Sequence, residues 1–135
     1  MTDTKPIRFA GYAGLFDVPD ADRDMIRKGA FAETLSRRSA PLPLLWQHRP
    51  EQQIGEIESV TEDERGLRVV ARIDRPQSRA ARMLMERTVS GLSFGYRARL
   101  SRVTDAGREL NEIDLFEVSL VTHPLQHGAR VHLVA

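Results

Sequence analysis

The chain has 135 residues, with 20 basic and 19 acidic side chains and no cysteine. This is the length of one ordinary domain, and 41% hydrophobic with 29% charged residues is typical of a globular protein, not a disordered one. The missing cysteines exclude disulfides and thiolate metal sites, and a net charge of +1 argues against a nucleic-acid partner. No stretch approaches the roughly 18 apolar residues of a membrane helix, so we expect no membrane anchor and no secretion signal.

A short helix followed by a buried strand is the first predicted pair of elements. The helix is expected from Ala30 to Arg38, with Phe31 and Leu35 one turn apart on its buried side. Two prolines then break the helical pattern, and the apolar run 44–46 predicts a buried strand.

A β-hairpin is the clearest prediction. Residues 53–61 and 67–73 form the two strands, and the polar, glycine-ended segment 62–66 forms the turn between them. In the second strand, alternate residues share one apolar face: Leu67, Val69, Ala71 and Ile73.

A second helix is predicted after this hairpin. Asp74 is the expected cap, Pro76 lies in the first turn, and the helix should end near Val89. Four residues at helical spacing form its buried stripe: Ala81, Leu84, Met85 and Thr88.

Two further alternating runs, 92–100 and 113–122, predict strands separated by a turn at 105–107. In the second run strict alternation places Glu117 on one face with Ile113, Leu115, Ser119 and Val121, and places Phe116, Val118 and Leu120 on the other. Many short strands and two helices predict a mainly β fold with flanking helices. A closed or nearly closed antiparallel β-barrel would remove the exposed strand edges.

Two polar residues occupy positions suited to catalysis. His48 lies where the buried strand enters a loop, and it is either a satisfied structural histidine or a general base with a pKa near neutrality. Ser93 lies in Gly91-Leu92-Ser93-Phe94-Gly95, and it is either an ordinary strand hydroxyl or a nucleophile beside backbone N–H groups. The α/β-hydrolase elbow is rejected because this motif opens a strand and not a strand-to-helix turn.

Glu117 has two interpretations, an outward-facing surface charge or a buried carboxylate that needs a partner such as a histidine N–H. The other histidines are His123, His127 and His132, and their spacing has no metal-site specificity. We therefore expect no metal and no cofactor.

Four motifs in order resemble one family, the HK97-type prohead (capsid maturation) proteases. The segment from Gly11-Tyr12-Ala13-Gly14-Leu15-Phe16 to Gly29-Ala30-Phe31 resembles its start. Pro43-Leu44-Leu45-Trp46-Gln47-His48 resembles its histidine motif, and Gly91-Leu92-Ser93-Phe94-Gly95-Tyr96 its serine motif. Glu117-Val118-Ser119-Leu120-Val121-Thr122 with Pro124 resembles its C-terminal signature, although Leu125 follows where a small residue is usual.

This resemblance implies a single prohead-protease domain over residues 1–135, related in fold to the herpesvirus assembly proteases. It implies a serine endopeptidase in which Ser93 is the nucleophile, His48 the general base and Glu117 the group that orients the histidine. Herpesvirus relatives use a second histidine in that third role, so His123 is a rival to Glu117.

The implied substrates are the major capsid protein and a scaffold segment of a tailed phage or phage-like particle, such as a gene transfer agent. The implied location is the cytoplasm of the bacterial host, inside the assembling prohead, and a homo-oligomer is compatible with the family. Two rival functions stay open. One is a catalytically inactive capsid-assembly or scaffold-binding domain of the same fold, and the other is a small ligand-binding β-barrel.

Overall fold

The structure is a computed structural model that describes residues 5–135. Strands and helices follow one another in chain order as β1 (Ile7–Leu15), β2 (Asp24–Ile26), α1 (Ala32–Ser36), β3 (Pro43–Trp46), β4 (Arg49–Glu62), β5 (Gly66–Ile73), α2 (Arg79–Met85), β6 (Gly91–Thr104), β7 (Gly107–Val121) and β8 (Val131–Val134). The predicted strands correspond to β3 to β7, whereas β1, β2 and β8 were not predicted. The mainly β prediction is confirmed.

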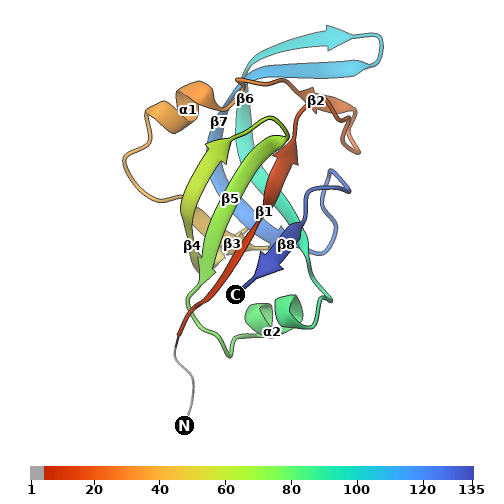
Figure 1. The fold of residues 1–135 in the computed structure, drawn as a ribbon. Coiled ribbons are helices and arrows are strands. Elements are labelled where there is room, and N and C mark those ends of the chain that lie inside the picture. Colours follow the sequence, from red (N-terminus) through yellow and green to blue (C-terminus); the bar gives the residue numbers. More distant parts are fainter. Residues whose placement is uncertain (1–4) are drawn as a thin grey trace.

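All of these strands belong to one strongly curled sheet, in the order β2-β7-β3-β4-β5-β1-β8, with β6 also paired to β7 (Figure 1). β4 and β5 form the predicted antiparallel hairpin. β2 and β3 run parallel to β7, so the sheet is mixed and not the antiparallel one expected from the sequence. The parallel pairing of β3 with β7 brings segments more than 70 residues apart side by side, with Leu44 opposite Val118.

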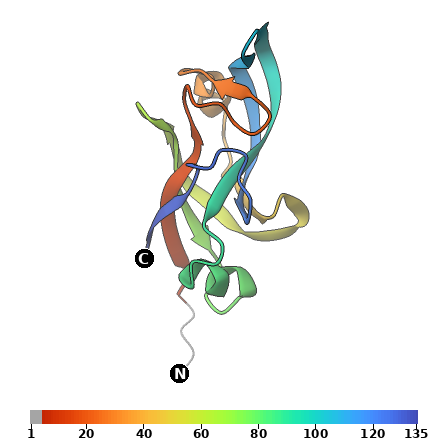
Figure 2. The ribbon, with the colours of Figure 1, turned by 90° about the vertical axis from the view of Figure 1, so that its right-hand side faces the viewer.

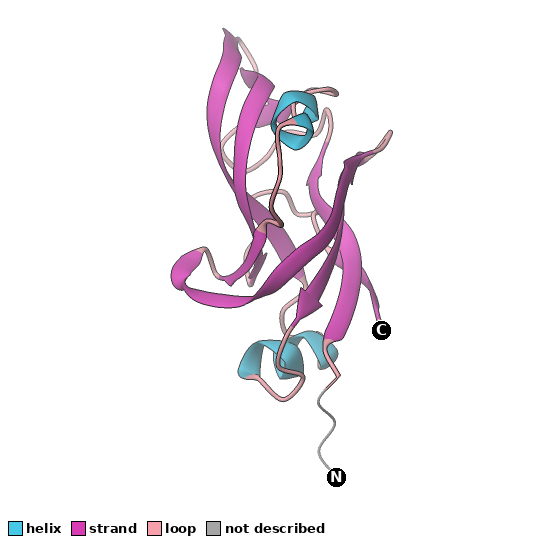
Figure 3. Cartoon of the chain, turned by 90° about the vertical axis from the view of Figure 1, so that its left-hand side faces the viewer, coloured by secondary structure: helices cyan, strands magenta, loops and turns pink. Residues whose placement is uncertain are grey.

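The sheet curls into an open half-barrel, and the closed or nearly closed barrel expected from the sequence is wrong. Seen from the side, the arm that carries β6 and β7 diverges from the arm that carries β4, β5 and β1 (Figure 3). Closing the barrel would need a ladder of hydrogen bonds between β6 and β8. Within residues 5–135, the start of β6 and the segment before β8 share a single isolated bridge, between Gly91 and Arg130. β8 has only four residues and pairs with β1, so it is too short to bridge the gap.

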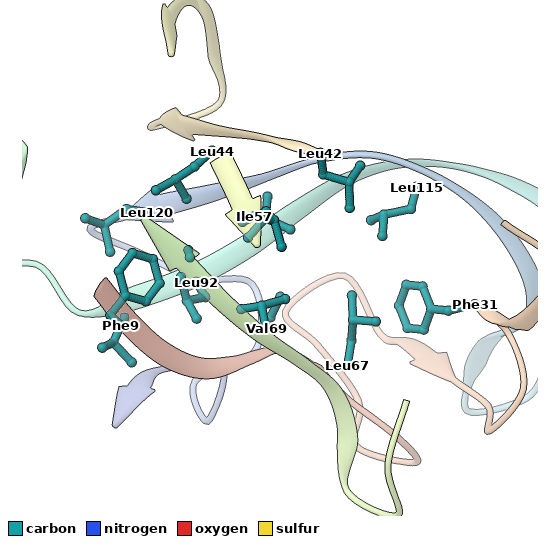
Figure 4. Close-up of a cluster of buried hydrophobic side chains, with 14 of the residues drawn as sticks. Phe9, Phe31, Leu42, Leu44, Ile57, Leu67, Val69, Leu92, Leu115 and Leu120 are labelled. Carbon is teal, nitrogen blue, oxygen red and sulfur yellow. The ribbon is translucent and has the colours of Figure 1, made fainter. Parts of the chain in front are cut away.

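The hydrophobic core fills the inner, concave side of the curl (Figure 4). β5 contributes the alternate residues that the sequence predicted to share a face, and Leu67, Val69, Ala71 and Ile73 are all 0% exposed. Leu44 of β3 and Leu92 of β6 reach the same core from other strands. Burying one such side chain stabilises the fold by about 1.5–3 kcal/mol, so this core fixes the strands on which the polar residues lie.

The two helices lie at opposite ends of the curled sheet (Figures 1 and 2). The predicted cap of the second helix is wrong, because the Ser78 hydroxyl accepts the hydrogen bond from Ala81 N, at 3.2 Å, and α2 begins at Arg79. Asp74 instead binds the Arg72 guanidinium at 2.7 Å. Within residues 5–135, neither helix is long and apolar enough to span a membrane.

A β-bulge interrupts β7 at Phe116. Tyr96 of β6 lies opposite Leu115 while its neighbour Gly95 lies opposite Glu117, so Phe116 has no partner in the ladder and is 52% exposed. An extra residue in one strand reverses which face the later side chains occupy. Before the bulge Ile113 and Leu115 face the core, and after it Val118 and Leu120 do. The predicted common face of Glu117 with Ile113 and Leu115 is therefore wrong.

Candidate active site

His48 lies in a tight two-residue turn between β3 and β4. Trp46 pairs with Arg49 across the turn, and the two residues between them, Gln47 and His48, have φ values of 53° and 60°. Positive φ at both central positions is the pattern of a type I′ hairpin turn, which normally selects asparagine and glycine. Non-glycine residues held in this conformation are under strain and are frequent at functional sites.

Gln47 fixes this turn to the end of β7. Its backbone N–H donates to the Leu120 carbonyl at 3.0 Å. Its side-chain amide makes two hydrogen bonds with Thr122, donating to Oγ1 at 2.6 Å and accepting from the backbone N–H at 3.1 Å. The turn is thus anchored to a strand of the core sheet, and the His48 side chain is presented from a fixed point.

The structure brings His48 and Glu117 together. His48 Nδ1 lies 2.5 Å from Glu117 Oε1, and the Glu117 side chain is only 13% exposed. The hydrogen bond and charge of Glu117 raise the pKa of His48 above its usual 6.5, and partial burial of the ring opposes this effect. Because an ionised carboxylate only accepts, Nδ1 carries the proton and Nε2 of a neutral His48 has its lone pair free.

Ser119 is a third member of this cluster that the sequence analysis did not single out. Its hydroxyl donates to Glu117 Oε2 at 2.6 Å and accepts the backbone N–H of His48 at 3.1 Å. Ser119 is 0% exposed. The available signal was its place two residues after Glu117 in the same strand, which puts both side chains on one face.

Ser93 of β6 lies directly opposite Ser119 of β7. Opposite residues of an antiparallel pair project to the same face with Cβ atoms roughly 4.5–5.5 Å apart, so Ser93 shares the outer face that carries Glu117 and Ser119. No hydrogen bond joins Ser93 to His48 within residues 5–135, and the serine is 7% exposed. It borders a hollow of about 20 Å³, whose lining also includes Asp20, Tyr96 and Leu125.

Gly95 leaves the space that the carboxylate occupies. It lies opposite Glu117, and a Cβ atom added at this position would come within 2.9 Å of Glu117 Cγ and still closer to Oε1. Any side chain here would push the carboxylate away from its present place. The glycine of the serine motif therefore has a steric role in the site, beyond the backbone freedom inferred from the sequence.

His123, the rival third residue, is exposed, and no hydrogen bond or ion pair joins it to His48 in the described part of the chain. Among residues 5–135, no group of three or more histidine, aspartate or glutamate side chains could hold a metal ion. A histidine with an orienting carboxylate, on the same sheet face as a serine, is the arrangement of groups used for nucleophilic acyl transfer.

Solved structures with the same fold include several viral proteases. The protease of Kaposi's sarcoma-associated herpesvirus, solved with a hexapeptide phosphonate inhibitor, matches with a TM-score of 0.68 at 15% identity, over 97% of this chain and 65% of that one. The capsid assembly protease of bacteriophage T4 matches with a TM-score of 0.64 at 16% identity, over 84% of this chain and 80% of that one. At these identities the likeness shows a shared fold.

Sequence comparison gives the family. The prohead protease of Enterobacteria phage HK97 is 32% identical in an alignment of 136 positions, which covers 96% of this chain and 60% of that protein. The chain thus spans about 60% of the length of this curated relative. The model of the Caudovirus prohead serine proteases, peptidase family S78, matches residues 1–135. The chain therefore belongs to the family of Caudovirus prohead serine proteases.

Proposed function

We propose that this protein is a serine endopeptidase that cleaves scaffold and major capsid protein segments during prohead maturation of a tailed phage or phage-like particle. In this proposal Ser93 is the nucleophile, His48 the general base, and Glu117 the residue that orients and stabilises the histidine. The observation that carries it is the His48–Glu117 hydrogen bond of 2.5 Å, beside a serine on the same face of the sheet. The site of action is the assembling prohead in the cytoplasm of the host.

The proposed reaction follows from the tautomer that Glu117 imposes. His48 Nε2 takes the Ser93 hydroxyl proton as the serine oxygen attacks a peptide carbonyl carbon, and the resulting imidazolium is stabilised by Glu117. The same proton passes to the leaving amine, which leaves an acyl-enzyme. Water, activated by neutral His48, then releases the acid and regenerates Ser93. The step requires His48 Nε2 to reach Ser93 Oγ when substrate binds, because catalytic hydrogen bonds often tighten only in the complex.

The membership of a prohead protease family supports the substrate assignment. The HK97 relative is named a prohead protease, and the T4 protein of the same fold is named a capsid assembly protease. By this likeness, the substrates of the present protein are the capsid protein and scaffold segment of its own particle.

The test is co-expression of the protein with the neighbouring major capsid protein, followed by intact-mass measurement of the capsid products. Wild type should yield a discrete shortened capsid protein, and Ser93→Ala should leave it intact. Ser101→Ala is the matched control, because Ser101 is an exposed serine on the same strand, β6. It should cut like wild type.

Thermal melting of all three proteins shows whether each one folds. If folded wild type leaves the capsid protein intact, the protease proposal fails, and the alternative of a catalytically inactive assembly or scaffold-binding domain takes its place. If Ser93→Ala cuts like wild type, Ser93 is not the nucleophile.

A further inference from the structure

Ser119 closes a ring of three hydrogen bonds around the His48–Glu117 pair. The His48 backbone N–H donates to Ser119 Oγ at 3.1 Å, and the Ser119 hydroxyl donates to Glu117 Oε2 at 2.6 Å. Glu117 Oε1 and His48 Nδ1, at 2.5 Å, complete the ring. The ring connects the backbone of His48 to its own side chain through Ser119 and Glu117 of β7. The Ser119 hydroxyl thus contacts both His48 and Glu117.

The donor and acceptor capacities of these groups fix the direction of every bond in the ring. A backbone N–H can only donate, and an ionised carboxylate can only accept. The hydroxyl has one proton, which must therefore point to Glu117 Oε2 while its lone pair receives the His48 N–H. Since Oε2 is occupied by Ser119, Oε1 is the oxygen left to face the imidazole.

We propose that Ser119 is a positioning residue, whose buried hydroxyl holds the Glu117 carboxylate and the His48 backbone in the relative orientation that keeps Nδ1 protonated and Nε2 free. The effect of this positioning role on catalysis rests on the proposed function. The orientation of His48 itself can be measured without any substrate. Ser119 touches neither substrate nor reacting atoms in this scheme. It acts through Glu117 and through the turn.

The position of Ser119 explains why a serine suits it. It lies between Ser93 of β6 and Leu45 of β3, opposite each in its ladder, and it is 0% exposed. The His48 N–H that it receives belongs to a residue with a positive φ of 60°, which lies outside regular sheet pairing. Alanine would leave both this N–H and Glu117 Oε2 without their partner.

A purely structural role for Ser119 makes a different prediction. If the hydroxyl served only to satisfy the N–H of the turn, its loss would lower stability and leave the ionisation and tautomer of His48 unchanged. Within residues 5–135, Glu117 is the ionisable group that acts on the His48 pKa. A change in that pKa in a Ser119 variant therefore reports a change in the Glu117–His48 contact.

The experiment is an NMR titration of the imidazole nitrogens in ¹⁵N-histidine-labelled full-length protein, comparing wild type, Ser119→Ala and Ser119→Cys. In Ser119→Ala we expect the His48 pKa to fall toward 6.5, and the Nδ1 proton to exchange at least about tenfold faster with water. Ser119→Cys keeps a weak donor of similar size and should fall between the two. The cysteine variant also provides the test if Ser119→Ala does not fold. Ser101→Ala, on the exposed part of β6, should match wild type.

The activity readout is the split between kcat and KM for capsid cleavage. Loss of a positioning hydrogen bond should lower kcat by roughly 10- to 100-fold, by analogy with the outer hydrogen-bond partners of metal-binding histidines, and change KM by less than about twofold. A folded Ser119→Ala or Ser119→Cys with wild-type His48 titration and proton exchange would overturn the inference. If His48 responds as expected but wild type never cuts, the protease proposal fails and the positioning role of Ser119 stands.

Discussion

Replacing Glu117 with glutamine gives the sharpest test of the proposed site. The substitution removes the charge and keeps the shape, and its effect can be worked out from the two contacts of the carboxylate. Oε1 faces His48 Nδ1 and Oε2 receives the Ser119 hydroxyl. A glutamine has one oxygen and one NH₂ group, so one of these two contacts must lose its acceptor.

The magnitude depends on which way the amide turns. If its oxygen faces His48, the site loses the charge that stabilises the imidazolium, and a hydrogen bond to a charged group is worth about 1.5–3 kcal/mol, or roughly 10- to 150-fold in rate. If its NH₂ group faces His48, Nδ1 must accept and Nε2 holds the proton, so no base is left. In Ser-His-Asp enzymes the corresponding change lowers kcat by about 10⁴. We expect a loss in kcat of roughly 10- to 10⁴-fold for Glu117→Gln, depending on the amide orientation.

The assay is steady-state cleavage of a peptide that spans the cut site identified by intact mass, measured between pH 5 and 9. In wild type, kcat/KM should rise with pH through a His48 pKa above 6.5, because only neutral His48 accepts the serine proton. In Glu117→Gln the residual activity should rise at a lower pH, because the pKa of His48 is no longer raised by the carboxylate.

Glu112→Gln is the matched control on the same strand, since Glu112 forms a surface pair with Arg99 at 3.6 Å and is 37% exposed. Such a pair contributes about 0–1 kcal/mol to stability and nothing to the site. A folded Glu117→Gln that retains more than a third of wild-type kcat with an unshifted pH profile would refute the assigned role of Glu117.

Three further outcomes are expected, two for stability and one for activity. The pKa of His48 is higher in the folded state than its unfolded-state value of about 6.5. The pairing with Glu117 therefore stabilises the folded protein fully below about pH 6.5, and this stabilisation is lost as the pH rises through the folded-state pKa. Urea unfolding measures the difference in unfolding free energy between wild type and Glu117→Gln, which should be no more than about 1 kcal/mol for so exposed a histidine. This difference should shrink from pH 6 to pH 9, and a difference that grows would contradict the reasoning. Leu67→Ala removes a 0% exposed side chain from the centre of the core and should cost about 2–5 kcal/mol by the same measurement, and a cost below about 1 kcal/mol would contradict the packing described. Gly95→Ala should fold, because the atoms it meets are the movable end of Glu117, but should lower kcat at least about tenfold; unchanged kcat would mean that the carboxylate position is unimportant.

The sequence predicted the strands that carry a clear apolar or alternating run. Residues 67–73 alternate without interruption, and the structure buries the expected face of β5 completely. β2 and β8 have three and four residues, too few to establish a period of two. β1 carries glycine and alanine at several positions, so its side chains give little alternation of hydrophobicity.

The bulge at Phe116 is the main reason that the face of Glu117 was wrongly predicted. A period of two assumes that no residue is added, and one unpaired residue shifts all later side chains to the opposite face. The prediction of Asp74 as the cap of the second helix, where the structure uses Ser78, failed for another reason. Both residue types cap helices well, and the ion pair of Asp74 with Arg72 is a tertiary contact that local propensity does not contain.

The candidate site was predicted from motifs, not from geometry. The resemblance of four motifs, in order, to one family pointed to His48, Ser93 and Glu117. The contact between His48 and Glu117, however, depends on the parallel pairing of β3 with β7 across about 70 residues of sequence. Such a non-local pairing leaves no periodic trace in a single sequence. Ser119 was missed because a serine in a strand has an ordinary explanation until its two hydrogen-bond partners are known.

Irregular features of the sheet converge on this one place. The turn at Gln47 and His48 adopts positive φ, β7 has a bulge at Phe116, and β6 has a glycine at position 95. Each would weaken an ordinary sheet, since a left-handed non-glycine residue alone costs about 1–2 kcal/mol. The bulge turns Glu117 to the outer face, the glycine leaves room for its carboxylate, and the turn presents the His48 ring to it.

Hydrogen bonds that hold the turn offset the cost of this geometry. Those made by Leu120, Thr122 and Ser119 to the turn each contribute about 0.5–1.5 kcal/mol, which together is comparable with the strain of two left-handed residues. The strained turn is therefore held by hydrogen bonds to backbone and side-chain groups of Ser119, Leu120 and Thr122, at and just after the end of β7. A relaxed type I′ turn of asparagine and glycine would serve the fold alone. Under the proposed function, the strain at Gln47 and His48 is explained by the need to place the His48 ring against Glu117.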